Sequence, residues 1–307
     1  FAMTPILTNP LIHSTMPFEN KDGRICLLLP FEDRVMIGST DIRIDDPEEA
    51  RCTEEEIDYM LKLVSIVFPT ITVNRSHIVF RFAGVRPLPH NEGVSTTGQI
   101  SRDHSIRVIE PSDRFTYPIY SLVGGKWTTF RAFSEQVTDR ALAYLEKSRI
   151  LHTQDLAIGG GADYPHGEME TRRWLDTLSQ SFDYPDEWLE RLFARYGTRL
   201  ETMLPFLTNG NDAPLQSCSE YTQREIRYLA ANEKVIHLDD LILRRTLIGM
   251  RGITSWEVLS ELANLVGSEL NWSEDQIAQE IATTIGILQD YNGLEFQESV
   301  RSKRDVS

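Results

Sequence analysis

Residues 124–131, with the sequence GGKWTTFR, carry the clearest chemical signal in this chain of 307 residues. An apolar run of strand-forming residues ends there on two glycines, and hydroxyl residues follow at the expected start of a helix. The free N–H groups of a helix start, at the positive end of its dipole, form an anion site. The segment is not a Walker phosphate loop, because Tyr120 and Trp127 stand where that motif needs a glycine and a hydroxyl residue. A glycine-assisted turn is the structural alternative, but it gives Lys126 no packing role, so we interpret the segment as an anion site.

A second candidate is Arg86, which leaves an apolar strand immediately before Pro87. Because proline cannot donate to a sheet ladder, the strand must end or lie at an edge there, and Gly84 clears space beside the arginine. A guanidinium offers a fork of donors that matches phosphate oxygens bidentately. The residue types alone fit an oxyanion site and a structural ion pair equally well.

Two weaker segments also contain residues suited to an anionic ligand. Ser39 and Thr40 follow a glycine at the end of a strand, where a ligand can approach the backbone, although a plain β-turn explains them as well. Arg102 could add positive potential to the same site, whereas its neighbour Asp103 is interpreted as a surface residue. The seven histidines show neither a triad nor metal-like spacing, so no metal site is predicted.

The distribution of charge favours the first half of the chain as the anion-binding half. Residues 1–150 hold 17 Lys and Arg against 20 Asp and Glu, whereas residues 151–307 hold 14 against 26. An anionic substrate would be repelled by the second half. No basic stripe with interleaved aromatic residues is present, so nucleic acid is not an expected partner.

Cysteine usage and hydropathy bear on the compartment. The three cysteines are widely spaced and form no C-x-x-C pair, which favours neither a disulfide framework nor a zinc site and suits a reducing cytosol. No apolar run approaches the roughly 20 residues that a membrane span needs. We therefore expect a cytoplasmic protein, with peripheral membrane contact left open.

The expected elements of the first 150 residues are strands joined by hairpins, with a capping box at Thr53 opening one helix between them. We expect strands at 24–31, 34–38, 77–85, 105–109 and 117–123, followed by a long helix at 127–147. These connections favour a mostly antiparallel sheet with helices to one side, and no βαβ alternation is present.

Beyond the glycine triplet at 159–161, which we interpret as a linker or turn, apolar residues recur at helical spacing. Helices are expected to start at Pro185 and to cover 219–231, 238–249, 255–266 and 273–290. Their apolar stripes are interpreted as core packing. The predicted fold class is therefore α+β, with a sheet domain at 1–150 followed by an all-helical C-terminal domain at 151–307.

Taken in order, these segments resemble the FAD-dependent glycerol-3-phosphate dehydrogenase family. The resemblance rests on residues 37–41 (IGSTD), 84–88 (GVRPL), 101–103 (SRD), 124–131 (GGKWTTFR), 239–240 (DD) and 244–246 (RRT). It covers nearly the whole chain, and Phe130 replaces the more usual tyrosine. The family's Rossmann unit with G-x-G-x-x-G is not found in these 307 residues. The chain thus resembles the C-terminal part of such an enzyme, and by itself is expected to hold FAD weakly or not at all and to be inactive.

The resemblance implies oxidation of sn-glycerol 3-phosphate to dihydroxyacetone phosphate, with hydride transfer to FAD. Residues 1–150 would then be a partial substrate-binding and FAD-contacting domain. The implied catalytic residues are Arg86 and Lys126, and the implied substrate-binding residues are Arg86, Lys126, Arg102, Ser39 and Thr40. The implied cofactor-binding residues are Gly124, Gly125, Lys126, Trp127, Thr128 and Thr129.

We expect Arg86 and Lys126 to converge on one pocket, because both follow strand ends beside glycines. The electron acceptor, a quinone or another molecule, is left open. The alternatives are a glycerol-3-phosphate oxidase that uses oxygen and, from a different class, a folded module without catalysis.

Overall fold

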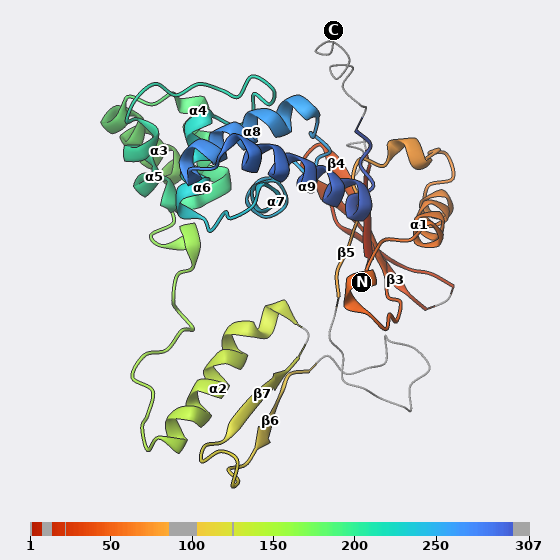
Figure 1. Cartoon of the computed structure of the whole chain (residues 1–307), viewed down its shortest axis with the longest axis vertical. Coiled ribbons are helices and arrows are strands. Elements are labelled where there is room, and N and C mark those ends of the chain that lie inside the picture. Colours follow the sequence, from red (N-terminus) through yellow and green to blue (C-terminus); the bar gives the residue numbers. More distant parts are fainter. Residues whose placement is uncertain (1, 8–13, 22, 86–102, 125, 297–307) are drawn as a thin grey trace.

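The computed structural model describes residues 2–7, 14–21, 23–85, 103–124 and 126–296, with side chains described from residue 14 onward. Within these ranges every strand precedes residue 124, and helices with their connecting segments follow residue 126, apart from one isolated β-bridge between Pro214 and Thr222 (Figure 1). The predicted α+β class, with antiparallel strands before a helical part, is confirmed.

A five-stranded antiparallel sheet occupies the first part of the chain, in the order β2-β3-β4-β1-β5. Its strands are β1 (Ala2–Leu7), β2 (Met16–Glu19), β3 (Ile25–Phe31), β4 (Arg34–Thr40) and β5 (Phe82–Ala83). The helix α1 (Glu54–Val67) begins at the predicted capping box, with the Thr53 hydroxyl accepting from the Glu56 N–H. Leu28 and Ile37 of the sheet pack against Met60 of α1 in a small apolar core.

The predicted strand at 77–85 is wrong in extent, because only Phe82 and Ala83 pair with the sheet. The residues just before them bond to a helix instead. The N–H of Arg81 donates to the carbonyl of Asn292 at 3.1 Å, and the Asn292 side chain donates to the carbonyl of Arg81 at 2.9 Å. Phe80 is buried in the core of the helical domain. This segment therefore joins the sheet to the last helix rather than extending the sheet.

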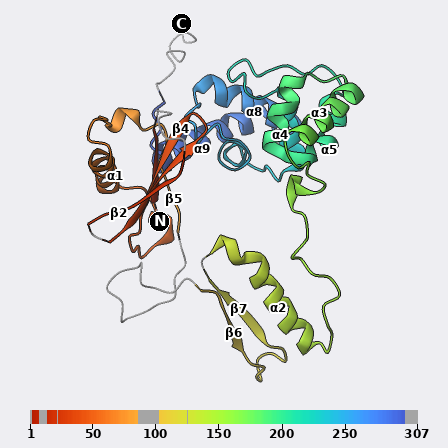
Figure 2. The ribbon, with the colours of Figure 1, turned by 180° about the vertical axis from the view of Figure 1, so that it is seen from behind.

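A second, two-stranded sheet is formed by β6 (Ser105–Ile109) and β7 (Ile119–Val123), and it does not join the first sheet. A 3-10 turn (Trp127–Thr129) leads from β7 into α2 (Phe130–Tyr144), which packs beside the hairpin. We call β6, β7 and α2 the hairpin–helix unit. Figures 1 and 2 show it set apart from both the five-stranded sheet and the helical domain.

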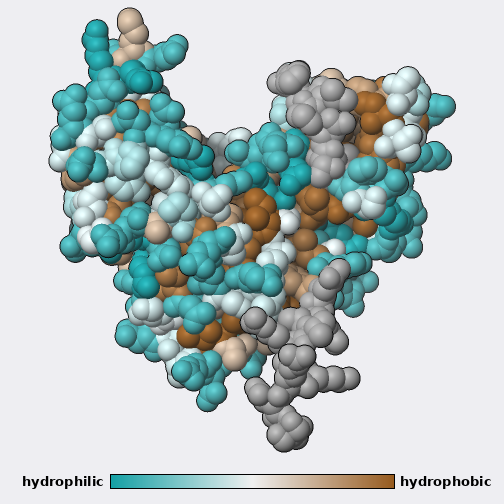
Figure 3. All heavy atoms as spheres, turned by 90° about the horizontal axis from the view of Figure 1, so that it is seen from above, coloured by the Kyte–Doolittle hydropathy of each residue, from teal (hydrophilic) through white to brown (hydrophobic). Residues whose placement is uncertain are grey.

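The helical domain has two adjoining apolar cores, one built around α3–α5 and one around α6, α8 and α9. Its helices are α3 (Glu168–Phe182), α4 (Asp186–Tyr196), α5 (Leu200–Leu207), α6 (Gln223–Asn232), α7 (Leu238–Asp240), α8 (Trp256–Leu270) and α9 (Glu274–Asn292). Polar residues cover most of the surface seen from above, with apolar residues gathered near its middle (Figure 3).

The single helix expected at 238–249 is wrong in form. It is instead the short α7 followed by a π-helical turn over Leu241–Arg245. Thr246 ends this turn, because its N–H and its hydroxyl both donate to the carbonyl of Leu241 at 2.9 Å. The five-residue spacing of that bond widens the helix and stops it there.

The glycine triplet, interpreted above as a linker or turn, forms a 3-10 turn (Gly159–Gly161) seated against a second 3-10 turn (Gly197–Arg199) between α4 and α5. A Cβ atom at Gly160 would lie 1.8 Å from the carbonyl oxygen of Tyr196. The Thr198 hydroxyl donates to the carbonyl of Gly160 at 2.9 Å. Gly160 therefore makes a backbone-to-backbone contact that only glycine allows, whereas a Cβ atom at Gly159 or Gly161 would meet nothing within 4 Å.

Candidate functional site

Lys126 lies between β7 and the helix start, as predicted, and its ammonium group contacts Asp103 Oδ1 at 2.9 Å. Both side chains are substantially exposed to solvent. The hydrogen bond from Lys126 lowers the pKa of the Asp103 carboxyl below its usual value. Sequence reasoning left Asp103 as a surface residue, because nothing in the adjacent Arg-Asp pair indicates a lysine 23 positions away as its partner.

The helix that follows begins without a side-chain cap in the part of the chain that the structure describes. Neither Lys126, before the 3-10 turn, nor Thr129, before α2, makes a side-chain capping bond, and the Thr129 hydroxyl donates backwards to the carbonyl of Lys126. Trp127 is 89% exposed at this point. The N–H of Thr129 donates to the carbonyl of Lys126 at 3.4 Å, so within the described residues the N–H of Thr128 is the one of this pair offered to a ligand.

Gly124 has a packing role at the end of β7. A Cβ atom there would lie 2.9 Å from the Cβ of His104, whose ring packs on Phe133 at 4.5 Å between ring centroids. Glycine at this position lets the end of β7 lie close to His104, the residue just before β6. Gly125 lies outside the described residues.

Ser39 and Thr40 end β4, as predicted, but they differ in accessibility. Thr40 is 1% exposed, and its hydroxyl donates to the carboxylate of Glu56 in α1. The side chain of Thr40 therefore links the sheet to α1 within the core. Ser39 is only partly buried, so its side chain is the more accessible of the two.

Arg86 and Arg102 both lie outside the described residues. The expectation that Arg86 and Lys126 share a pocket therefore stays a prediction. The chain position of Arg86, three residues after β5, is consistent with a strand that ends shortly before the proline.

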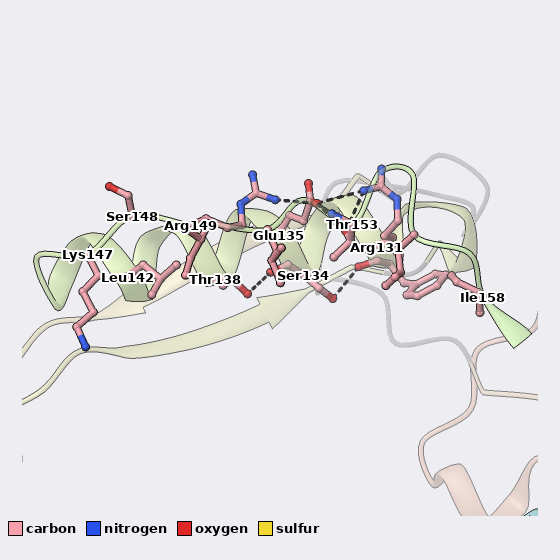
Figure 4. Close-up of a pocket in the computed structure, with 14 residues that line it drawn as sticks. Arg131, Ser134, Glu135, Thr138, Leu142, Lys147, Ser148, Arg149, Thr153 and Ile158 are labelled. Carbon is pink, nitrogen blue, oxygen red and sulfur yellow. Dashed lines mark hydrogen bonds and ion pairs between the residues drawn. The ribbon is translucent and has the colours of Figure 1, made fainter. Parts of the chain in front are cut away.

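An open groove of about 570 Å³ runs along α2, between the helix and the returning segment 147–158 (Figure 4). Glu135 of α2 connects the helix to the returning segment. The N–H and hydroxyl of Thr153 donate to Glu135 Oε1 at 2.7 and 2.6 Å, and Arg149 lies 2.7 Å from the same oxygen. The bonds from Thr153, followed by the contact with Arg149, lower the pKa of Glu135 from 4.5 to about 2.

This shift predicts a titration that can be observed directly. Because the folded pKa lies below the unfolded one, the stability that the bonds of Glu135 contribute is fully present above about pH 4.5 and is lost as the pH falls to about 2, where the folded carboxylate is protonated. We expect the amide proton resonance of Thr153 to titrate with a midpoint near 2. Glu135→Gln should abolish that titration, whereas a midpoint near 4.5 in the unsubstituted chain would show that the bonds do not form.

A second cavity, of about 480 Å³, is lined by five arginines of the helical domain. Four of them are matched by carboxylates, as shown by the pairs Arg191–Glu187, Arg195–Glu225, Arg244–Asp239 and Arg251–Glu220. Arg251 also reaches Asp33 in the turn between β3 and β4 at 3.3 Å. The cluster is therefore an ion-pair network that connects the helical domain to the turn between β3 and β4. Because four of its five arginines are paired with carboxylates, we do not assign it as an anion site.

Neither a metal-ligand cluster nor a membrane-spanning helix is found among the described residues. They contain no group of three or more His, Cys, Asp or Glu side chains that could hold a metal ion. None of the helices in the described ranges is long and apolar enough to cross a membrane.

Comparison with known proteins identifies the class of this protein. Residues 2–117 match the family model described as FAD dependent oxidoreductase, and residues 151–277 match that of the C-terminal domain of alpha-glycerophosphate oxidase. The solved glycerol-3-phosphate dehydrogenase from Bacillus halodurans, complexed with FAD, shares the fold over 94% of this chain and 56% of its own, with a TM-score of 0.73 and 19% identity. The chain therefore matches a family of FAD dependent oxidoreductases in sequence and shares the fold of the solved dehydrogenase.

The relatives narrow the class to one family. The aerobic glycerol-3-phosphate dehydrogenase of Escherichia coli is 30% identical over 76% of this chain and 45% of its own length. The mouse mitochondrial glycerol-3-phosphate dehydrogenase is 28% identical over 87% of this chain and 36% of its own. The chain belongs to the FAD-dependent glycerol-3-phosphate dehydrogenase family, and it spans less than half the length of these relatives.

Proposed function

We propose that the enzyme containing this chain oxidises sn-glycerol 3-phosphate to dihydroxyacetone phosphate with FAD as the hydride acceptor. The observation that carries the proposal is the uncapped helix start after β7, with Lys126 directly before it. The names of the relatives support the substrate, and the family model supports the cofactor. Domain boundaries near residue 150 are part of the same proposal, with residues 1–150 contacting substrate and FAD.

The residues at the helix start fit one edge of FAD. A cluster of N–H donors with a cation beside it suits a group that becomes negatively charged, as the pyrimidine edge of a flavin does on reduction. The residues from Gly124 to Thr129 would hold that edge, and the bound flavin would supply hydride acceptance. The glycine-rich cradle for the pyrophosphate is not found in these 307 residues, so we propose that this chain alone binds FAD weakly.

Substrate binding is proposed for the cations of the less acidic half. Arg86 would hold substrate oxygens through its planar fork, and Lys126 and Arg102 would add positive charge for the phosphate. Lys126 would exchange Asp103 for the ligand, which an exposed ion pair allows at small cost. Ser39 and Thr40 remain candidates for the pocket wall, with Ser39 the more accessible.

Arg86→Ala in the complete enzyme is expected to lower kcat/KM for glycerol 3-phosphate by about tenfold to a hundredfold. The reason is the loss of a charge-assisted contact, worth about 1.5–3 kcal/mol. Arg86→Lys should restore only part of the loss, because a point charge cannot reproduce the planar fork. Steady-state kinetics at equal FAD content measure the effect, with Arg173→Ala on the exposed surface of α3 as the matched control. An unchanged kcat/KM would leave Arg86 as a structural ion-pair residue.

A second candidate function differs in the electron acceptor. The match of residues 151–277 to the C-terminal domain of alpha-glycerophosphate oxidase favours a glycerol-3-phosphate oxidase that passes electrons to oxygen. For a dehydrogenase we propose instead that a quinone or another molecule accepts the electrons. The protein would then be cytoplasmic and in peripheral contact with a membrane. Stoichiometric hydrogen peroxide during turnover would favour the oxidase, and reduction of a soluble quinone without peroxide would favour the dehydrogenase.

A further inference from the structure

Residues 79–83 connect the helical domain to the five-stranded sheet. Phe80 is buried in the core of the helical domain, and Val79 packs against the same core. A Cβ atom at Gly252, in the turn before α8, would lie 2.9 Å from the carbonyl oxygen of Val79, so the two backbones approach closely. Phe82 and Ala83, which follow, pair with β1. The helical domain and the sheet thus hold neighbouring residues of one short segment.

The strand β5 is too short to fix this segment by itself. It has two residues and pairs with β1 alone among the described strands. Just before β5, the N–H of Arg81 donates to the carbonyl of Asn292 at 3.1 Å, and Asn292 Nδ2 donates to the carbonyl of Arg81 at 2.9 Å. Neighbouring antiparallel strands exchange such a pair of bonds. The end of α9 therefore takes the place of a second strand beside Arg81.

The C-terminal end of α9 is itself anchored near the sheet (Figure 1). Arg51, shortly before α1, contacts Asp290 at 2.7 Å, and its guanidinium carbon lies 3.2 Å from the centroid of the Tyr291 ring. Asn292 follows directly and is 6% exposed. Because the last carbonyls of a helix have no partner within the helix, the carbonyl of Asn292 is available to Arg81.

The side chain of Arg81 adds a contact with α1. Its Nη1 lies 2.7 Å from a carboxylate oxygen of Glu54, and this bond lowers the pKa of Glu54 below its usual value. The backbone of Arg81 is thus held by α9 and its side chain by α1. Ala83, the last residue of the sheet ladder here, is only three positions before Arg86. A displacement of this segment is therefore passed along the chain to Arg86.

We propose that Asn292 is a positioning residue for substrate binding and that it acts through Arg86. Its two bonds to Arg81 set the place at which the chain leaves β5 for Arg86. The inference rests on the proposed function, in which Arg86 holds oxygens of glycerol 3-phosphate. A small misplacement of a substrate-binding group lowers the rate, because the substrate is no longer held in the reactive geometry. The helical domain thus contributes to the reaction through the chain rather than by contact with the substrate.

The complete enzyme that contains this chain, loaded with FAD, provides the test. Asn292→Ala removes the side-chain bond and keeps the backbone bond from Arg81. We expect kcat/KM for glycerol 3-phosphate, measured per bound FAD, to fall by about threefold to tenfold, mainly through a higher KM, as for the loss of one neutral hydrogen bond. Asn292→Asp, which keeps the volume but replaces the donor with an acceptor, should change kcat/KM in the same direction. Asn264→Ala, which removes a similar bond to the carbonyl of Ser260 on the exposed side of α8, is the matched control and should leave kcat/KM unchanged.

A double-mutant cycle separates positioning from a general effect on the fold. In the Arg86→Ala enzyme, Asn292→Ala should change kcat/KM by less than about twofold, because the group that Asn292 positions is gone. A purely structural role would lower the yield of FAD-loaded enzyme without raising KM, and any effect on kcat/KM would be the same with and without Arg86.

Two outcomes overturn the inference and leave the proposed function standing. In the first, Arg86→Ala lowers kcat/KM, whereas both Asn292 variants behave as Asn264→Ala does. In the second, Asn292→Ala lowers kcat/KM by the same factor in the unsubstituted and the Arg86→Ala enzymes. If Arg86→Ala itself leaves kcat/KM unchanged, the substrate role of Arg86 is wrong and the positioning role of Asn292 is wrong with it. The cycle therefore distinguishes a failure of the inference from a failure of the proposed function.

Discussion

Replacing Glu225 with alanine is expected to lower the free energy of unfolding of the helical domain by about 3–5 kcal/mol. The Glu225 side chain is fully buried, and its two oxygens lie 2.9 and 3.1 Å from Nη1 of Arg195. The Tyr196 hydroxyl donates to it at 2.7 Å. Burial raises the pKa of this carboxyl while Arg195 acts in the opposite direction. Removing the carboxylate leaves the largely buried Arg195 without a carboxylate partner, although it still donates to the carbonyl of Glu220 at 2.8 Å.

Urea unfolding followed by circular dichroism measures this effect. Glu225→Gln should cost less than Glu225→Ala, because the amide keeps the volume and can still accept a bond from Tyr196. Glu201→Ala, at an exposed position of α5, is the matched control and should change stability by less than about 0.5 kcal/mol. Equal stabilities for Glu225→Ala and Glu201→Ala would show that the buried pair contributes nothing net.

Gly160→Ala is expected to break the contact between the glycine triplet and the turn that joins α4 to α5. The added Cβ would meet the carbonyl oxygen of Tyr196 at 1.8 Å, and backbone cannot move aside as a flexible side chain can. Overpacking of this kind costs about 1–3 kcal/mol or more. We therefore expect the segment around residue 160 to detach and to become a site of rapid proteolysis.

The neighbouring glycine provides a matched control for that experiment. A Cβ atom at Gly161 would meet nothing within 4 Å, so Gly161→Ala should leave both the proteolysis rate and the stability nearly unchanged. Limited proteolysis with mass-spectrometric mapping compares the two variants. Similar cleavage of both near residue 160 would mean that the seated turn does not persist in solution.

Local signals explain which elements could be predicted from the sequence. The capping boxes at Thr53 and Ser273 fixed the starts of α1 and α9, because each depends only on residues three positions apart. Strand β6 was predicted with its observed bounds, since a short apolar run between turns needs no distant partner to be recognised. Strands β1 and β2 were not predicted.

Long-range contacts explain what the sequence could not supply. The strand expected at 77–85 is shorter because Arg81 bonds to Asn292 instead of to a neighbouring strand. The glycine triplet packs against the turn at Gly197. Neither contact is indicated by a local sequence pattern. In the candidate site, the strand-to-helix position of Lys126 was predicted, but its partner Asp103 was not. The predicted pocket residue Thr40 proved to be buried against Glu56, a contact between a strand and a helix that hydroxyl-rich spacing cannot reveal.

The bonds between Arg81 and Asn292 also set an order of assembly during synthesis. The two residues lie 211 positions apart, so Arg81 leaves the ribosome long before the helix that anchors it. At about 5–20 residues per second, that interval is on the order of ten seconds or more. During that time the carbonyl and N–H of Arg81, five residues before Arg86, have no Asn292 to bond. The segment leading to the proposed substrate arginine is therefore completed by a residue that is made 211 positions later.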